Sequence, residues 1–367
     1  MQNILPLIVF GVIFVSFLLQ LYYYLFIFYK IGLKRLEKTP EHIDKPISVI
    51  LCIKNESKDL SKILPLILEQ NYPEYEVIVV NDNSTDDSKN VLKLAQTKYP
   101  RLQIRNLLLN NNFRGKSVVL GIGIKAAKYD WITMINTACR PSANWLKSIS
   151  TGFESDIVVG YTRYSAASKF VRITNYYESL FRLGYALNKK PYTASGENES
   201  FRKKLFFEKG FNPLLRKPEK VEQVFFNSVM NKKNTSVVLL REAIVDSKKS
   251  LSFDEWCLEC SGELFSRRLF RKGSRHRKSP EIISRTLFYL SIASAIIMTA
   301  NDIKLCMLIV GIFLLRLSIQ IFVFHSTQKA LGENKLIWNT LLWDFYSIAV
   351  YLYVAMLIRH RKAIKYK

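Results

Sequence analysis

The sequence predicts an α/β protein whose mostly parallel sheet lies between an N-terminal transmembrane helix and a C-terminal bundle of membrane helices. Short apolar runs alternate with segments of helical spacing between residues 45 and 156. Long apolar runs stand at both ends of the chain, and basic residues flank them. We therefore expect a transmembrane helix at residues 1–30, a soluble domain at 31–280, and a membrane domain of two or three helices with a basic tail at 281–367.

The first apolar run, Ile4–Tyr29, carries no charged residue and is long enough to cross a bilayer with some tilt. A signal peptide is the alternative, but no basic residue precedes this run and no small-residue cleavage site follows it. Basic residues follow from Lys30 onward, so the positive-inside rule places the soluble domain in the cytoplasm. We expect a multi-pass protein of the inner (cytoplasmic) membrane.

The formal net charge of +24 raises nucleic acid as a partner. The basic residues gather beside the apolar runs, however, so we interpret them as membrane flanks that attract anionic lipids. No stacking platform or recognition helix is evident, and we expect no nucleic-acid partner. The five cysteines form no disulfide framework, and the pair Cys257 and Cys260 is expected to pack as thiols in a helix rather than hold zinc.

The soluble domain begins with alternating strands and helices. The expected strands are Ile47–Ile53, the run ending at Val80, Leu102–Leu109, Trp131–Ile135 and Ile157–Val159, and the expected helices cover 60–69, 86–98 and 116–127. This order predicts a parallel sheet with right-handed crossovers. Asp82 follows the second strand, at the edge where open α/β sheets bind ligands, although an isolated Asp there would be interpreted as a turn or capping residue.

The C-terminal part contains three apolar runs, at 286–300, 305–324 and 336–358. The first is short for a span and could lie at the interface, whereas the other two are expected to form a hairpin. Three full spans would put the basic tail outside, against the positive-inside rule, and an interfacial first run would repair this conflict. Arg316 and Asp344 would lie at the same depth, ~12 Å from one membrane face. We expect them to pair, with separate snorkelling as the alternative.

Five segments between about residues 46 and 260 resemble, in order, motifs of the family 2 glycosyltransferases of GT-A fold, particularly bacterial membrane-anchored members. They are Ile47–Glu56, Gln70–Asp86, Asn112–Asp130, Cys139–Leu146 and Ser195–Lys203. The resemblance implies a Rossmann-like GT-A domain that transfers a sugar from a nucleotide-sugar, UDP-linked, to a lipid-linked or polysaccharide acceptor. It also implies a role in polysaccharide or cell-envelope biosynthesis.

The resemblance further implies which residues bind the substrates. The nucleotide-binding positions are Ile53, Lys54, Asn55, Glu56, Asp82, Ser84, Gly115 and Lys116. Asp82 and Glu56 can accept hydrogen bonds from a base or a ribose hydroxyl, and Lys116 could approach the diphosphate from a helix start. The acceptor-side positions are Glu197, Asn198 and Arg202.

Three motifs that carry the family's chemistry depart from its pattern. The Asp-x-Asp that holds Mg²⁺ or Mn²⁺ against the diphosphate falls at Asn136, a weak ligand, and Ala138, which is none. The base position falls at Gln223, and Glu222 is the neighbouring acid that remains. The Gln-x-x-Arg-Trp motif falls at Glu259, Gly262 and Glu263, with Arg275 and His276 as a second placement.

Two hypotheses follow from these departures. The chain could be a working glycosyltransferase in which Glu222 or Glu197 acts as base and Lys116, Lys54 or Arg140 replaces the cation. It could instead be a catalytically inactive relative that binds a nucleotide-sugar, a glycan or a partner enzyme.

Overall fold

The computed structural model describes residues 4–34, 41–107, 116–208, 220–333 and 336–365. The chain divides into two compact units, one formed by Glu37–Arg271 and one formed by Met1–Leu36 together with Lys272–Lys367. Gly115 lies outside the described residues.

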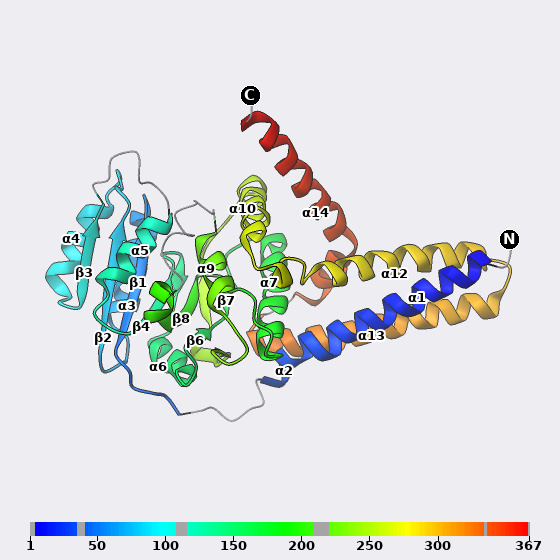
Figure 1. The fold of residues 1–367 in the computed structure, drawn as a ribbon, viewed down its shortest axis with the longest axis horizontal. Helices are drawn as coiled ribbons and strands as arrows, with labels where there is room; N and C mark the ends of the chain where they lie inside the picture. Colours follow the sequence, from blue (N-terminus) through cyan, green and yellow to red (C-terminus); the bar gives the residue numbers. More distant parts are fainter. Residues whose placement is uncertain (1–3, 35–40, 108–115, 209–219, 334–335, 366–367) are drawn as a thin grey trace. The chain divides into compact units, whose positions relative to one another are not determined.

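The first unit is built on a seven-stranded sheet in the order β3-β2-β1-β4-β8-β6-β9 (Figure 1). Its strands are β1 (Ile47–Ile53), β2 (Tyr75–Asn81), β3 (Leu102–Asn106), β4 (Trp131–Ile135), β6 (Ile157–Val159), β8 (Asn198–Arg202) and β9 (Thr235–Val237). Only β8 runs antiparallel to its neighbours among these strands. The predicted mostly parallel α/β sheet is confirmed, although the third strand ends at Asn106, before the expected Leu109.

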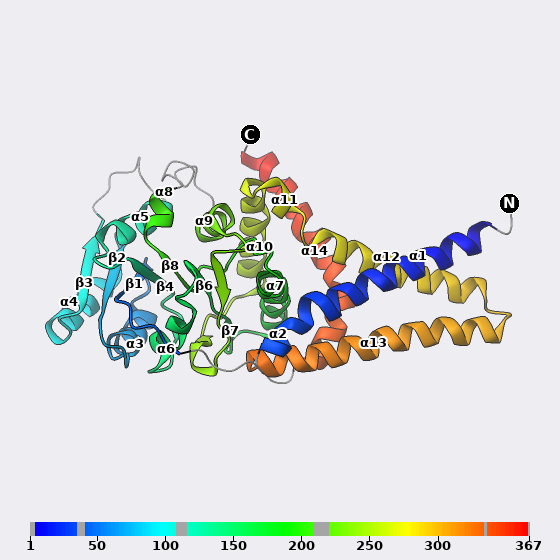
Figure 2. The ribbon, with the colours of Figure 1, turned by 60° about the horizontal axis from the view of Figure 1, so that its bottom comes forward.

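Helices cover both faces of this sheet because successive residues of its buried strands point to opposite sides. Helices α3 (Ser57–Leu68), α4 (Ser88–Lys98) and α6 (Trp145–Ile149) lie on one face, and α5 (Lys116–Ala126) lies on the other (Figure 2). A Cβ atom at Gly123 of α5 would lie 2.8 Å from Ile50 Cγ2, so glycine lets this helix pack closely on β1.

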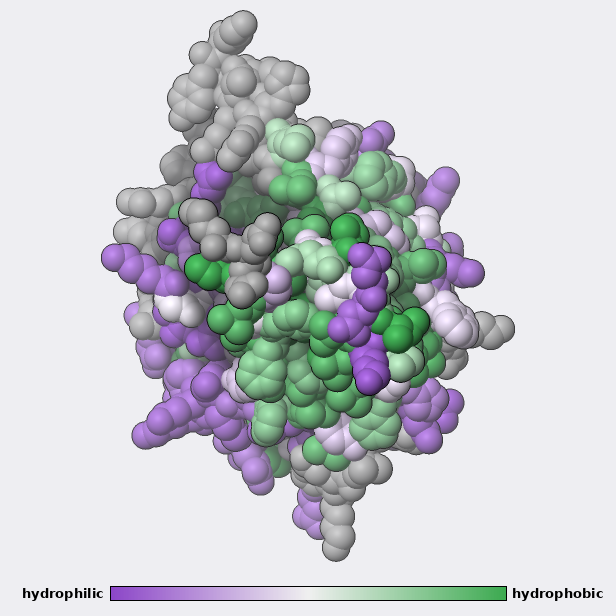
Figure 3. Space-filling view, turned by 90° about the vertical axis from the view of Figure 1, so that its right-hand side faces the viewer, coloured by the Kyte–Doolittle hydropathy of each residue, from purple (hydrophilic) through white to green (hydrophobic). Residues whose placement is uncertain are grey.

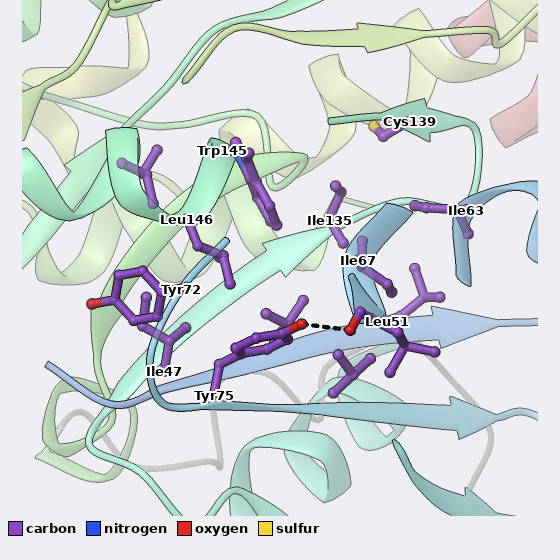
Figure 4. Packing of buried hydrophobic residues seen from close by; sticks show 14 of the residues in the cluster. Ile47, Leu51, Ile63, Ile67, Tyr72, Tyr75, Ile135, Cys139, Trp145 and Leu146 are labelled. Carbon is purple, nitrogen blue, oxygen red and sulfur yellow. Dashed lines mark hydrogen bonds between the residues drawn. The ribbon is translucent and has the colours of Figure 1, made fainter. Parts of the chain in front are cut away.

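The core under α3 and α6 is apolar and tightly packed (Figure 4). Ile63 and Ile67 of α3 and Trp145 of α6 are fully buried in it. The polar tip of Tyr75 is accommodated because its hydroxyl donates a 2.6 Å hydrogen bond to the Leu68 carbonyl, at the end of α3. The remaining helices of this unit are α7 (Lys169–Leu187), α8 (Lys204–Glu208), α9 (Val221–Val229) and α10 (Phe253–Ser266).

A second, small sheet lies beyond the carboxyl end of β4. It consists of β5 (Cys139–Arg140), β10 (Val245–Ser247) and β7 (Thr162–Tyr164), in the order β5-β10-β7. Ser247 pairs with Cys139, so the segment after residue 245 lies against the chain that leaves β4. This sheet is not predictable from the sequence, because strands of two or three residues show no recognisable alternation of apolar and polar residues.

The second unit contains the terminal apolar helices. The N-terminal helix comprises α1 (Ile4–Leu21), a π-helical segment (Tyr22–Phe28) and α2 (Tyr29–Lys34). The C-terminal helices are α11 (Lys272–Arg275), α12 (Ser279–Met298), α13 (Ile303–Leu331) and α14 (Ile337–Lys365). Among the described residues, three segments are long and apolar enough to cross a bilayer: Ile4–Lys34, Lys272–Met298 and Ile303–Leu331.

Within this unit α1, α12 and α13 run lengthwise together, and α14 crosses them obliquely (Figures 1 and 2). Figure 3 looks onto the end that contains the start of α1 and the turn between α12 and α13, where hydrophobic side chains cover much of the surface. The chain turns back sharply at residues 299–302, between α12 and α13. The expected hairpin of the second and third apolar runs is wrong in this respect, because α14 does not lie along α13.

A buried polar cluster joins all four long helices of this unit. Asp344 of α14 accepts hydrogen bonds from Arg316 at 2.9 Å and Gln320 at 2.8 Å, both on α13. Arg285 of α12 lies 3.0 Å from the other oxygen of Asp344, and Arg316 also donates to the Tyr24 hydroxyl at 2.6 Å. The predicted pair of Arg316 and Asp344 is confirmed. Arg285 is a second partner of Asp344, which comparing the depths of Arg316 and Asp344 in the membrane could not reveal.

Candidate active site

The carboxyl ends of β1 and β2 meet at one edge of the large sheet. Ile53 and Asn81 are paired in register, and Asp82 donates its backbone N–H to the Ile53 carbonyl at 2.9 Å. Lys54 Nζ then lies 3.0 Å from Asp82 Oδ2, and both side chains are accessible to solvent. The structure thus brings these predicted nucleotide-binding residues together.

Two asparagines shape the turns that leave these strands. Asn55 and Asn83 have φ angles of 55° and 50°, the left-handed region that asparagine tolerates better than most residues. Asn55 N donates a 3.0 Å hydrogen bond to Ser84 Oγ, and Thr85 N donates a 2.8 Å hydrogen bond to Asn55 Oδ1. Ser84 therefore fixes the relative positions of the two turns, whichever ligand they contact.

Glu56 connects the edge at β1 with the end of β4. Its Oε2 accepts a 2.7 Å hydrogen bond from Thr137 Oγ1, in the segment that corresponds to the family's metal motif. Desolvation raises the pKa of the Glu56 carboxyl, while the Thr137 hydrogen bond and the charge of Lys116 oppose the rise. Glu56 thus lies close to both predicted halves of the site.

The loop before β8 supplies a carboxylate beside the end of β4. Asn136 Nδ2 donates to Glu197 Oε1 at 3.1 Å, and the Tyr164 hydroxyl donates to the same oxygen at 2.9 Å. The buried Glu199 carboxylate shapes this loop by accepting hydrogen bonds from Ser195 N at 2.8 Å and Ser195 Oγ at 2.6 Å. Glu197 therefore stands near the position where the family's motif would place its first aspartate.

Helix α9 brings Glu222 to the same place. Lys116 Nζ, at the start of α5, lies 2.8 Å from Glu222 Oε1, and the Glu222 side chain is only 8% exposed. A Cβ atom at Gly196, where φ is 86°, would lie 2.5 Å from Glu222 Cβ. Glycine at 196 is thus what allows α9 to approach the loop that carries Glu197.

The side chains of the other two predicted acceptor-side residues, Asn198 and Arg202, are engaged in contacts within the protein. Asn198 is fully buried: its Oδ1 accepts from Trp145 Nε1 at 2.9 Å, and its Nδ2 donates to two backbone carbonyls. Arg202 pairs with Trp131 at the opposite end of β4, ~13 Å from Asn198 by strand rise, and forms an ion pair with Asp130. Because β8 runs antiparallel, it carries Arg202 away from Glu197, whereas Asn198 stays next to Glu197 with its amide engaged in the core. An acceptor-side role for these two residues stays a prediction.

One of the suggested replacements for the cation is engaged in holding a turn. Arg140 Nη1 donates to the carbonyls of Thr137 and Cys139, both at 2.7 Å, and its Nη2 lies 3.0 Å from Asp59 Oδ1. These contacts fix the chain after β4 and engage the Arg140 guanidinium within the protein.

The two positions of the family's metal motif offer at most one weak side-chain ligand for a divalent cation. Within the described parts of the chain, no three His, Cys, Asp or Glu side chains converge on a point that could hold a metal ion. Asn136 presents an amide that donates to Glu197, and Ala138 has no ligand atom.

A basic segment, Lys248 and Lys249, lies beside this site and was not predicted from the sequence. Lys248 N donates a 2.8 Å hydrogen bond to the Ala138 carbonyl, and Lys249 forms an ion pair with Glu259 of α10. Lys248 and Ala138 are more than 100 positions apart in the sequence. Only the pairing of β10 with β5 in the structure reveals that they are neighbours. Two adjacent lysines in the sequence would otherwise indicate a solvated surface.

Comparison with known proteins agrees with this geometry. The family model described as Glycosyl transferase family 2 matches residues 48–221. Residues 48–221 form a family 2 glycosyltransferase domain. This glycosyltransferase domain is similar to AglE of Haloferax volcanii, with 29% identity over 140 residues, which are 35% of this chain and 45% of that protein. It is also similar to the hyaluronan synthase of Pasteurella multocida, with 31% identity over 144 residues, 38% of this chain and 14% of that protein.

These matches span less than half of the length of either relative. Among solved structures, the chain is similar to the mannosyltransferase PcManGT from Pyrobaculum calidifontis in complex with GDP-Man and Mn²⁺. The TM-score is 0.57 at 15% sequence identity, covering 94% of this chain and 99% of that one. The fold is therefore GT-A, with apolar helices that could span a membrane at both ends of the chain.

Proposed function

We propose that this chain is a membrane-bound enzyme that transfers a sugar from a nucleotide-sugar, UDP-linked, to a lipid-linked or glycan acceptor. The observation that carries the proposal is the meeting of Glu222, Lys116 and Glu197 beside the nucleotide edge at Asp82 and Glu56. A relative that is a hyaluronan synthase and a structural neighbour bound to GDP-Man support the same substrate classes.

The arrangement suggests how the groups would act. Asp82 and Glu56 would accept hydrogen bonds from the nucleoside, and the diphosphate would extend toward Lys116. The Lys116 ammonium would then leave Glu222, and the freed carboxylate could take the proton of an acceptor hydroxyl. The acceptor oxygen forms a bond to the anomeric carbon while the bond to the diphosphate breaks, and the nucleoside diphosphate departs with the electron pair.

We further propose that the charge of the departing diphosphate is balanced by basic side chains rather than by a divalent cation. The donor set at Asn136 and Ala138 supports this, because neither residue offers a carboxylate. Lys116 is placed at a helix start, where free N–H groups add to its charge.

The orientation in the membrane is proposed on the charge pattern. With the soluble unit in the cytoplasm, α12 would cross outward and α13 would return. An α14 that stays at the interface would then keep the basic tail on the cytoplasmic side. The interfacial segment that satisfies the positive-inside rule would thus be α14 rather than the first apolar run.

The test is sugar transfer by membranes that contain the full chain, with labelled UDP- and GDP-sugars, with and without EDTA. We expect turnover that survives EDTA and falls ~100-fold or more in Glu222→Gln, which keeps the size of the side chain but cannot take the proton. Nucleotide binding without turnover for any donor would favour the alternative, an inactive relative that binds a nucleotide-sugar, a glycan or a partner enzyme. Glu197→Gln is the matched variant, because Glu197 is the other carboxylate at the site.

A further inference from the structure

We propose that Lys249, positioned by Glu259, supplies the positive charge that neutralises the departing diphosphate. The inference rests on the proposed transfer reaction and assigns within it a residue that lies outside the matched family segment, residues 48–221.

The backbone places Lys249 at the end of β4. Ser247 of β10 pairs with Cys139, and Lys248 N donates to the Ala138 carbonyl at 2.8 Å. The next residue, Lys249, donates its own N–H to Ser247 Oγ at 3.3 Å, which turns the chain there. Lys249 thus stands beside Asn136–Ala138, the segment where the family's cation ligands would lie.

The charges around Lys249 are not balanced one to one. Glu259 of α10 forms ion pairs with Lys249 and with Lys220, whose Nζ lies 3.5 Å from Glu259 Oε2. Two lysines therefore share this carboxylate, and the three groups together carry a charge of +1. The nearby Glu255 is engaged in the capping box of α10 with Ser252. By contrast, Lys54, Lys116 and Arg140 each face a carboxylate of their own, in Asp82, Glu222 and Asp59.

The two lysines favour the charged form of Glu259. Burial opposes ionisation of the Glu259 carboxyl, but the charges of Lys220 and Lys249 outweigh it and lower the pKa of Glu259. The field of Lys249 also extends to the nucleotide side, where it helps to lower the pKa of Glu56 against the desolvation that raises it. The Lys249 side chain is 28% exposed, so its ammonium is accessible to a ligand.

A diphosphate is the anion that this arrangement suits. A lysine acts on phosphate as a mobile point charge, and the surplus charge allows Lys249 to leave Glu259 while Lys220 remains as its partner. Glu259 is then a positioning residue. In the first placement of the Gln-x-x-Arg-Trp motif, Glu259 stands at the position of the glutamine and Gly262 at the position of the arginine.

The experiment compares UDP with UMP, and GDP with GMP, by calorimetry on the purified full chain in detergent with EDTA. The wild type should bind the diphosphate more tightly than the monophosphate. Lys249→Ala should lose ~10-fold or more of this difference, the size expected for a charged hydrogen bond, and leave monophosphate affinity unchanged. Unchanged monophosphate binding also shows that the variant is folded. Lys249→Arg should keep part of the difference.

Lys232→Ala is the matched control, because Lys232 is exposed in the turn before β9, at the opposite end of the sheet. A diphosphate preference that survives in Lys249→Ala, or that appears only when Mn²⁺ is added, would overturn the assignment while leaving the proposed transfer intact. A wild type that binds none of the four nucleotides would instead contradict the proposed function itself.

Discussion

Lys116 has two possible partners, and this determines how the site would respond to its donor. In the structure its Nζ lies 2.8 Å from Glu222 Oε1, and a bound diphosphate would compete for it. The competition would couple donor binding to the base, so that the Glu222 carboxylate is released from Lys116 only when a donor is present. Asp82 is held in a similar way by Lys54, at 3.0 Å, on the nucleoside side.

Asp82→Ala should therefore weaken nucleotide binding. We expect ~10-fold lower affinity for UDP, because a hydrogen bond to a charged acceptor is lost and Lys54 is left without its partner. Calorimetry on the full chain measures the change. Asp130→Asn, at the opposite end of the sheet, serves as control, and equal affinity of Asp82→Ala and wild type would remove Asp82 from the pocket.

Short elements do more for this site than the long ones. The three strands of the small sheet have two or three residues each, yet they fix Lys249 beside the end of β4. The loop before β8 depends on Gly196 for its left-handed turn and for the space that α9 occupies. Burial of Glu199 under this loop raises the pKa of its carboxyl, although hydrogen bonds from Ser195 and Asn198 oppose the rise.

Gly196→Ala should disturb both the fold and the site. An added Cβ would lie 2.5 Å from Glu222 Cβ at a φ of 86°, so we expect a loss of ~1–3 kcal/mol in unfolding free energy and a displaced Glu222. Thermal unfolding and transfer activity of the purified protein report the two effects. Gly273→Ala is the control, because a Cβ there meets no atom within 4 Å, and equal stability of the two variants would contradict the close packing.

At the level of the whole chain, the two units differ in how they place their ion pairs. The first unit leaves Lys54, Asp82 and Lys116 accessible at a sheet edge, where a ligand can take the place of one partner in each ion pair. The second unit buries Arg285, Arg316 and Asp344 completely, and the two arginines share the Asp344 carboxylate. The second arrangement ties α12, α13 and α14 together because any unpaired member would be costly.

Asp344→Leu should destabilise the second unit more than Arg316→Leu does. Removing Asp344 leaves two buried arginines without their shared partner, whereas removing Arg316 leaves Asp344 paired with Arg285 at 3.0 Å. We expect a difference of ~3 kcal/mol or more in favour of Arg316→Leu. Thermal unfolding in detergent measures it, and the reverse order would show that Arg285 does not act as a partner.

Local patterns were sufficient for much of the architecture. The apolar strands β1 to β4, the polar turns after Ile53 and Asn81, and the pairing of Arg316 with Asp344 follow from periodicity, turn chemistry and helix rise, which depend on neighbouring residues. Contacts between distant segments required the folded chain. They include Glu197 beside Asn136, Arg285 beside Asp344, Lys248 beside Ala138, and Arg202 carried away from the site by an antiparallel strand. Such contacts depend on how elements pack and in which direction strands run, and no local spacing records either.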